Sequence, residues 1–201
     1  MSKNCLLCGV GGQGVLLASK LIACAAMEQG LKVRTSETIG MSQRGGSVVS
    51  HVRMGEEVHS PMIPEGQADL ILAFEPAEAV RSLSYLKKGG AVVVNRKAVQ
   101  SAVSTLSQQG YEGDEMIEYL RAQDLRLYVV DGEELCARAG SPKVLNVALL
   151  GTAAASGALG ITPEEMEREI RRKVKPAYVE MNVKALALGA QAEITSRNLN
   201  K

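Results

Sequence analysis

Ten residues near the start of the chain, CLLCGVGGQG at positions 5–14, constrain its fold more than any other stretch. Gly9, Gly11 and Gly14 have the spacing G-x-G-x-x-G, between a short apolar run and a segment with helical periodicity. Glycines at such a point allow a sharp turn and a close approach of the backbone to another group. This stretch therefore predicts a β-α turn of the kind that opens a nucleotide-binding domain.

The elements around this turn predict an α/β architecture. A strand at 3–9, a helix from Gly11 to about Gln29 and a strand at 31–35 form a β-α-β unit. Its two strands are predicted to pair in parallel with a right-handed crossover. A polar loop is expected at Ser36–Gly46, followed by a half-exposed strand at Ser47–Met54, where apolar and polar residues alternate.

The remainder of the chain continues the pattern and then becomes helical. DLILAF at 69–74 and AVVVN at 91–95 read as strands that are covered on both faces. One helix is predicted at 143–159, a second after the capping box that begins at Thr162, and a last one at Tyr178–Leu188, closed by Gly189. We therefore expect one domain, residues 1–201, with a Rossmann-like, doubly wound, mostly parallel sheet and a helical C-terminal quarter.

Composition narrows the possible partners. The net charge is +1, and no block of Lys and Arg with interleaved aromatics is present, so nucleic-acid binding is not expected. The longest apolar stretch, at 144–160, is rich in Gly, Ala, Ser and Thr, so no membrane span is expected either. Four scattered cysteines without a signal peptide indicate free thiols in a reducing cytoplasm.

The glycine turn leaves three interpretations open. The start of a helix offers free N–H groups and positive potential to a pyrophosphate. A nicotinamide site also needs an acid at the tip of the second strand, and Glu37, 23 residues after Gly14, comes late and lies in the expected loop. The turn therefore indicates a redox dinucleotide, another phosphate-bearing ligand, or a structural turn without a ligand.

Two further patterns suggest chemistry only weakly. Cys5 and Cys8 form C-x-x-C inside a predicted strand, where a spacing of three sends the two side chains to opposite faces. They are therefore predicted to be buried structural thiols rather than a redox pair or cluster ligands. His51 and His59 are the only histidines, and no acid or cysteine pattern completes a metal site around them.

A second motif lies in the expected loop at 40–46, which reads GMSQRGG. A hydroxyl, an amide and a guanidinium are predicted to lie near the carboxyl ends of the strands, beside the glycine turn. An arginine there suits a carboxylate or phosphate, although a partner subunit could equally contact this loop. We expect neither catalytic residues nor metal ligands; the candidate binding residues are Gly9, Gly11, Gly12, Gln13, Gly14, Ser42, Gln43, Arg44, Gly45 and Gly46.

These two motifs together carry a resemblance to a known family. GVGGQGVLLASKLIA at 9–23 and TIGMSQRGGSVVSHVRMG at 38–55 resemble the gamma-type subunit of 2-oxoacid:ferredoxin oxidoreductases. Within that family the chain most resembles the small (beta) subunit of indolepyruvate:ferredoxin oxidoreductases. The likeness continues at 68–81, 143–157 and 178–189 and is least informative at 96–125.

The resemblance implies a complex that oxidatively decarboxylates a 2-oxoacid, expected to be indolepyruvate, with coenzyme A as co-substrate and ferredoxin as acceptor. It also implies that thiamine diphosphate and 4Fe-4S clusters belong to a large partner subunit, so the isolated chain is expected to be inactive. Whether the isolated chain forms a homodimer is left open. The alternatives are an autonomous NAD(P)-dependent dehydrogenase and a non-enzymatic, ligand-sensing module of the same fold.

Overall fold

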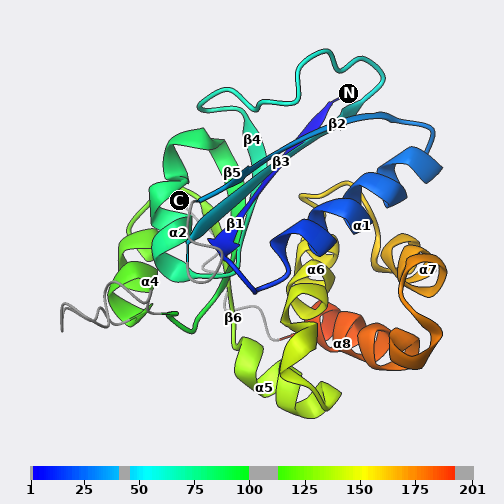
Figure 1. Ribbon diagram of the computed structural model, residues 1–201. Coiled ribbons are helices and arrows are strands. Elements are labelled where there is room, and N and C mark those ends of the chain that lie inside the picture. The colour runs from blue at the N-terminus through cyan, green and yellow to red at the C-terminus, as the bar shows by residue number, and fades with distance from the viewer. Residues whose placement is uncertain (1, 41–45, 100–112, 193–201) are drawn as a thin grey trace.

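The computed structural model describes residues 2–40, 46–99 and 113–192. Its centre is a six-stranded sheet with the order β2-β3-β1-β4-β5-β6 (Figure 1). β1, β4, β5 and β6 run parallel, whereas β3 is antiparallel to both β1 and β2. The strands are β1 (Lys3–Val10), β2 (Lys32–Ile39), β3 (Ser47–Gly55), β4 (Ala68–Ala73), β5 (Leu86–Asn95) and β6 (Arg126–Val130).

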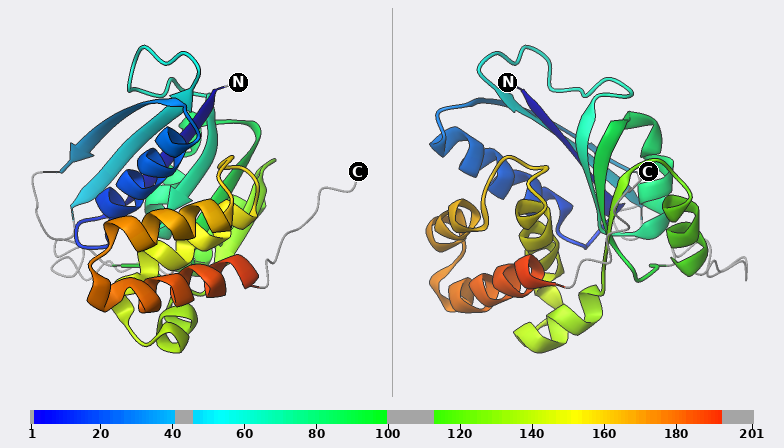
Figure 2. Two further views of the ribbon diagram at one scale, coloured as in Figure 1. Left: turned by 90° about the vertical axis from the view of Figure 1, so that its right-hand side faces the viewer. Right: turned by 180° about the vertical axis from the view of Figure 1, so that it is seen from behind.

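Helices cover both faces of the sheet, which confirms the doubly wound architecture (Figure 2). One face carries α1 (Val15–Glu28) together with the C-terminal helices, and the other carries α2 (Pro76–Arg81) and α4 (Gly113–Arg121). The helical C-terminal quarter is also confirmed. It consists of α5 (Gly132–Ala139), α6 (Leu145–Ala155), α7 (Pro163–Lys173) and α8 (Val179–Gln191), with 3-10 turns at Pro142–Val144 and Pro176–Tyr178.

Strand alternation divides the core into two layers. Along β1, Cys5 and Leu7 pack on the α1 side, while Leu6 and Cys8 pack on the side of α2 and α4. The two thiols of C-x-x-C therefore point to opposite faces, as their spacing predicts. Burial raises the pKa of Cys8 to about 12 and raises that of Cys5 as well, and all four cysteines are free thiols.

The predicted parallel pairing of the first two strands is wrong, because β3 lies between them. β3 is an interior strand rather than a half-exposed one, and its polar side chains have partners. Ser50 Oγ donates to Ser19 Oγ at 2.8 Å, and His51 Nδ1 accepts a hydrogen bond from the Ile63 N–H at 3.2 Å. These hydrogen bonds let a strand of alternating polarity be buried on both faces.

Several element boundaries also differ from expectation. β2 extends to Ile39, so the first four residues of the expected loop at Ser36–Gly46 belong to a strand. The predicted helix at 143–159 is a 3-10 turn followed by the shorter α6. α8 continues through Gly189, where a Cβ would lie 1.8 Å from the Ala148 carbonyl oxygen. This glycine therefore serves a close contact between helices rather than a helix end.

Candidate functional site

The glycine turn lies between the carboxyl end of β1 and the start of α1. Gly12 and Gly14 have φ angles of 99° and 83°, in the left-handed region that favours glycine, so α1 begins at Val15 and not at Gly11. Gly14 is the N-cap residue, and no side chain caps the helix. The first-turn N–H groups of α1 are therefore left to a ligand or to solvent. At Gly12 an added Cβ would meet no atom within 4 Å.

Gln13 and Gly9 shape this turn from the inside. Gln13 Oε1 accepts a hydrogen bond from the Val10 N–H at 2.8 Å, and Gln13 Nε2 donates to the Phe74 carbonyl at 3.0 Å. A Cβ at Gly9 would lie 2.8 Å from the Phe74 Cβ. Gln13 thus ties the turn to the end of β4, and both of its amide atoms are engaged within the protein.

The structure brings the glycine turn and the end of the second motif together. The Gly11 N–H donates to the Gly46 carbonyl at 2.9 Å, and the Gly40 N–H donates to the Ser47 carbonyl at the same distance. β2 and β3 therefore form a hairpin whose closing residues contact the turn directly. Ser42, Gln43, Arg44 and Gly45 lie outside the described residues.

Polar side chains that the sequence analysis missed complete this edge of the sheet. Asn95, at the end of β5, donates through Nδ2 to the Phe74 carbonyl at 3.3 Å and accepts through Oδ1 from the Gly132 N–H at 3.2 Å. The Phe74 carbonyl therefore accepts hydrogen bonds from both Gln13 and Asn95. Asn146 Nδ2 donates to the Gly14 carbonyl at 3.3 Å. The signal for Asn95 was present, since it directly follows an apolar run of strand length.

Two buried carboxylates lie behind the same edge. Glu75 caps α2 by accepting from the Glu78 N–H at 3.0 Å, and its other oxygen accepts from the Val99 N–H at 3.4 Å. Burial raises the pKa of Glu75. Glu78, 3% exposed, accepts from Ser47 Oγ at 2.6 Å and pairs with Arg81. Glu75 therefore holds the segment after β5, and Glu78 holds the start of β3; both segments border the carboxyl edge of the sheet.

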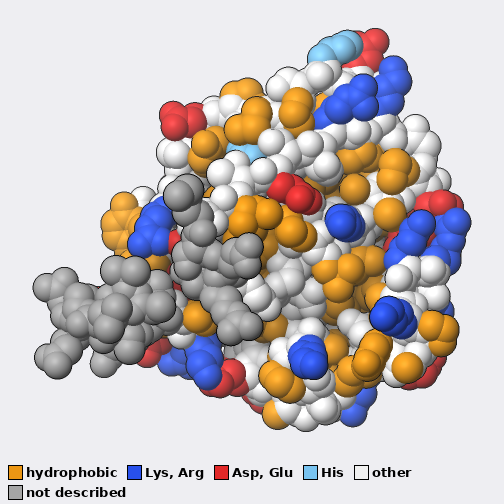
Figure 3. Space-filling model, viewed as in Figure 1, with side chains coloured by type: hydrophobic (Ala, Val, Ile, Leu, Met, Phe, Trp, Pro, Cys, Tyr) orange, Lys and Arg blue, Asp and Glu red, His pale blue; other side chains and the backbone are white. Residues whose placement is uncertain are grey.

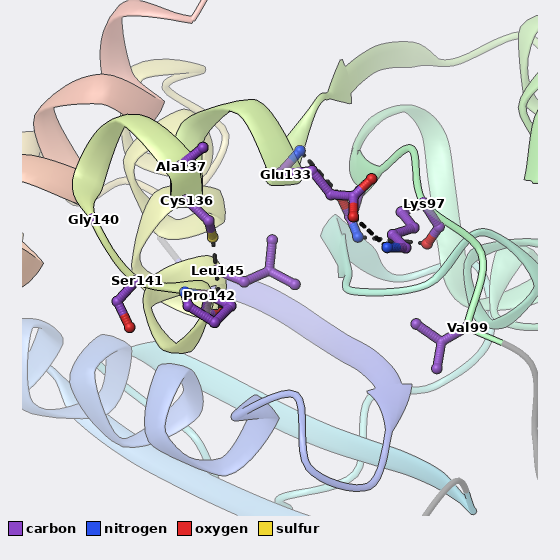
Figure 4. Close-up of a pocket in the computed structure, with 11 residues that line it drawn as sticks. Lys97, Val99, Glu133, Cys136, Ala137, Gly140, Ser141, Pro142 and Leu145 are labelled. Atoms are coloured by element: carbon purple, nitrogen blue, oxygen red, sulfur yellow. Dashed lines mark hydrogen bonds and ion pairs between the residues drawn. The ribbon is translucent and has the colours of Figure 1, made fainter.

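A pocket of about 610 Å³ lies between the segment that follows β5 and helix α5, and Asn95 belongs to its lining (Figure 4). Its lining is mostly apolar, and Lys97 and Glu133 form an ion pair at one side of it. Cys136 points its sulfur toward the Pro142 carbonyl, 3.9 Å away, and burial raises the pKa of this thiol. The lining residues are Asn95, Lys97, Val99, Gly132, Glu133, Cys136, Ala137, Gly140, Ser141, Pro142 and Leu145.

Basic and acidic side chains are interspersed on the face in Figure 3, rather than gathered into one basic surface. In the part of the chain that the structure describes, no group of three His, Cys, Asp or Glu side chains could hold a metal ion. None of the described helices has the length and apolar character needed to cross a membrane.

The fold and the site define the class of protein: a Rossmann-like α/β chain whose glycine turn, at the carboxyl edge of the sheet, leads into a helix without a side-chain cap. The chain belongs to the pyruvate ferredoxin/flavodoxin oxidoreductase family, whose model matches residues 4–192.

Similar proteins within this family point to one branch. "Indolepyruvate oxidoreductase subunit IorB" of Archaeoglobus fulgidus is 42% identical over 198 residues, which is 98% of both chains. The subunit of the same name from Pyrococcus horikoshii is 39% identical over the same share. The common gamma subunit of the pyruvate/ketoisovalerate oxidoreductases of Thermococcus kodakarensis is 25% identical, covering 88% of this chain and 89% of that one.

Solved structures share the fold. The gamma subunit of a keto/oxoacid ferredoxin oxidoreductase from Geobacter sulfurreducens has a TM-score of 0.71 at 24% identity, with 94% of each chain covered. A 2-oxoglutarate:ferredoxin oxidoreductase from Magnetococcus marinus has a TM-score of 0.72 at 20% identity, and there this chain matches 30% of a longer chain.

Proposed function

We propose that this chain is the small subunit of an indolepyruvate:ferredoxin oxidoreductase complex, in which coenzyme A is the co-substrate and ferredoxin the acceptor. The support for indolepyruvate is the similarity over nearly the full length to two subunits of that name, at 39% and 42% identity. Thiamine diphosphate and 4Fe-4S clusters belong to the large partner subunit in this proposal. The four free cysteines of this chain suit a reducing cytoplasm.

Within that complex, the glycine turn is the part that binds coenzyme A. The observation that carries this assignment is the uncapped start of α1, next to Gly12, where the turn is open. The pyrophosphate of coenzyme A suits such a helix start, because free N–H groups and positive potential meet negative charge there. Arg44, from the second motif, would add a two-pronged contact to a phosphate.

A nicotinamide cofactor fits the same turn less well. The acid that would hold its ribose belongs on the strand beside β1. In this chain β3 occupies that place, and Glu37 lies instead on β2, at the edge of the sheet. The position of β3 therefore separates the turn from the one acid that the spacing offered.

The test is equilibrium binding of coenzyme A to the assembled complex with Arg44→Ala in this chain. We expect the affinity to fall by about tenfold or more, since a charge-assisted contact to phosphate is lost. Arg34→Ala is the matched control, because Arg34 is an exposed arginine of β2 whose guanidinium donates to the carbonyl of its neighbour Val33. Unchanged affinity in Arg44→Ala would argue against coenzyme A at this turn.

A further inference from the structure

The carboxylate of Glu78 lies behind the candidate site and contacts the start of β3. Glu78 is 3% exposed, and its Oε2 accepts a hydrogen bond from Ser47 Oγ at 2.6 Å. Arg81 pairs with the other carboxylate oxygen, so Oε2 is free to hold Ser47. A buried carboxylate needs such partners, and hydrogen bonds to it are stronger than those between neutral groups.

Ser47 lies one residue from the contact that joins the two motifs. Its backbone carbonyl accepts from Gly40 and closes the hairpin, and the carbonyl of the preceding Gly46 accepts from Gly11. α2, which carries Glu78, is itself fixed at its start by the side chain of Glu75. Two hydrogen bonds, joined by the backbone of Gly46 and Ser47, therefore connect α2 to the glycine turn.

We propose that Glu78 and Ser47 are positioning residues for coenzyme A: their hydrogen bond holds Gly46 against Gly11 and so fixes the edge of the glycine turn. Neither side chain touches the ligand in this proposal, which rests on the proposed function of the turn. Small displacements of groups that position a ligand are costly, because the bound geometry must be prepared before the ligand arrives.

The test uses Ser47→Ala in the assembled complex. Coenzyme A affinity is expected to fall about three- to tenfold, which corresponds to the net worth of one hydrogen bond. The KM for coenzyme A should rise by the same factor, while kcat at saturating coenzyme A stays within about twofold, as expected when only ground-state binding is lost. Ser47→Thr, which keeps the hydroxyl at an exposed position, should restore the affinity.

Ser50→Ala is the matched control in the same strand. It also removes a serine side-chain hydrogen bond, but the partner is Ser19 of α1 rather than a residue that contacts the glycine turn. Equal weakening by Ser50→Ala and Ser47→Ala would mean that β3 loosens as a whole, which contradicts positioning. If Arg44→Ala weakens binding and Ser47→Ala does not, the positioning role is overturned while the proposed function stands. If neither variant changes the affinity, both proposals fail.

Discussion

Gly14 is the residue on which the geometry of the candidate site depends most. Its φ of 83° ends the turn and begins α1. A Cβ there would lie 2.6 Å from Asn146 Nδ2, so the position excludes a side chain on both conformational and steric grounds. Gly30, with a φ of 80° and no atom within 4 Å of an added Cβ, has the conformational requirement alone.

Alanine substitutions at Gly30 and Gly14 separate the conformational cost of a side chain from its steric cost. Gly30→Ala is expected to lower the free energy of unfolding by about 1–2 kcal/mol, the cost of a left-handed alanine. Gly14→Ala is expected to cost about 2–4 kcal/mol, since Asn146 must also move. Urea unfolding of the purified chain, with equal slopes for the variants, reports both values. Equal losses in the two variants would show that Asn146 adapts freely and that the close approach carries no energy.

At the residue scale, the sequence predicted the features that depend on a single local rule. The opposed faces of Cys5 and Cys8 followed from strand periodicity alone, and the turn at Gly14 followed from glycine spacing. The roles of Gln13 and Glu78 did not follow from any local pattern. Each makes its decisive contact with a residue 31 or more positions away, Gln13 with Phe74 and Glu78 with Ser47, and no local pattern encodes such a partner.

At the scale of elements, the C-terminal helices show how tightly two backbones can approach. α6 and α8 meet at two glycines: a Cβ on Gly151 would lie 2.1 Å from the Leu186 carbonyl oxygen, and one on Gly189 would lie 1.8 Å from the Ala148 carbonyl oxygen. Thr152 Oγ1 adds a hydrogen bond to the Gly189 carbonyl at 2.8 Å. The small residues of this region therefore set the distance between the two helices.

Gly189→Ala is expected to destabilise the chain by about 3 kcal/mol or more, because the two backbones must separate. The sign of this change in stability is informative, since alanine in an unhindered helix interior is about 1 kcal/mol more stabilising than glycine. Ala187→Gly, at an exposed position of α8, measures that intrinsic helix effect in the same element. Thermal unfolding compares the variants. A Gly189→Ala chain as stable as the parent would contradict the contact.

The order of the strands was the element-scale feature that sequence could not supply. The predicted strand segments at 69–74 and 91–95 fall on β4 and β5, since each is a continuous apolar run, but β5 begins at Leu86 and includes the two glycines that had predicted a turn. The place of β3 between β1 and β2 depends on pairing across the sheet, and a β-α-β pattern favours direct parallel neighbours. Burial of Ser50 and His51 depended on hydrogen-bond partners in Ser19 and Ile63, which are 31 and 12 residues away.

At the scale of the whole molecule, the chain is expected to require its companion. Purified alone, it should show no oxoacid-dependent reduction of an electron acceptor, because the proposed complex keeps thiamine diphosphate and the clusters on the large subunit. Mixing it with that subunit should restore turnover, measured with a viologen dye and coenzyme A. Turnover of indolepyruvate by this chain alone would contradict the assignment.

The hairpin formed by β2 and β3 lets the connection between these strands vary while the sheet stays the same. A connection between adjacent antiparallel strands can change length or content without reordering the sheet, whereas a crossover between parallel strands cannot. The residues between Gly40 and Gly46 can therefore be replaced while β2 and β3 keep their pairing. Grafting the equivalent hairpin connection from a relative should therefore change what meets a ligand beside the glycine turn and leave the order of the strands unchanged.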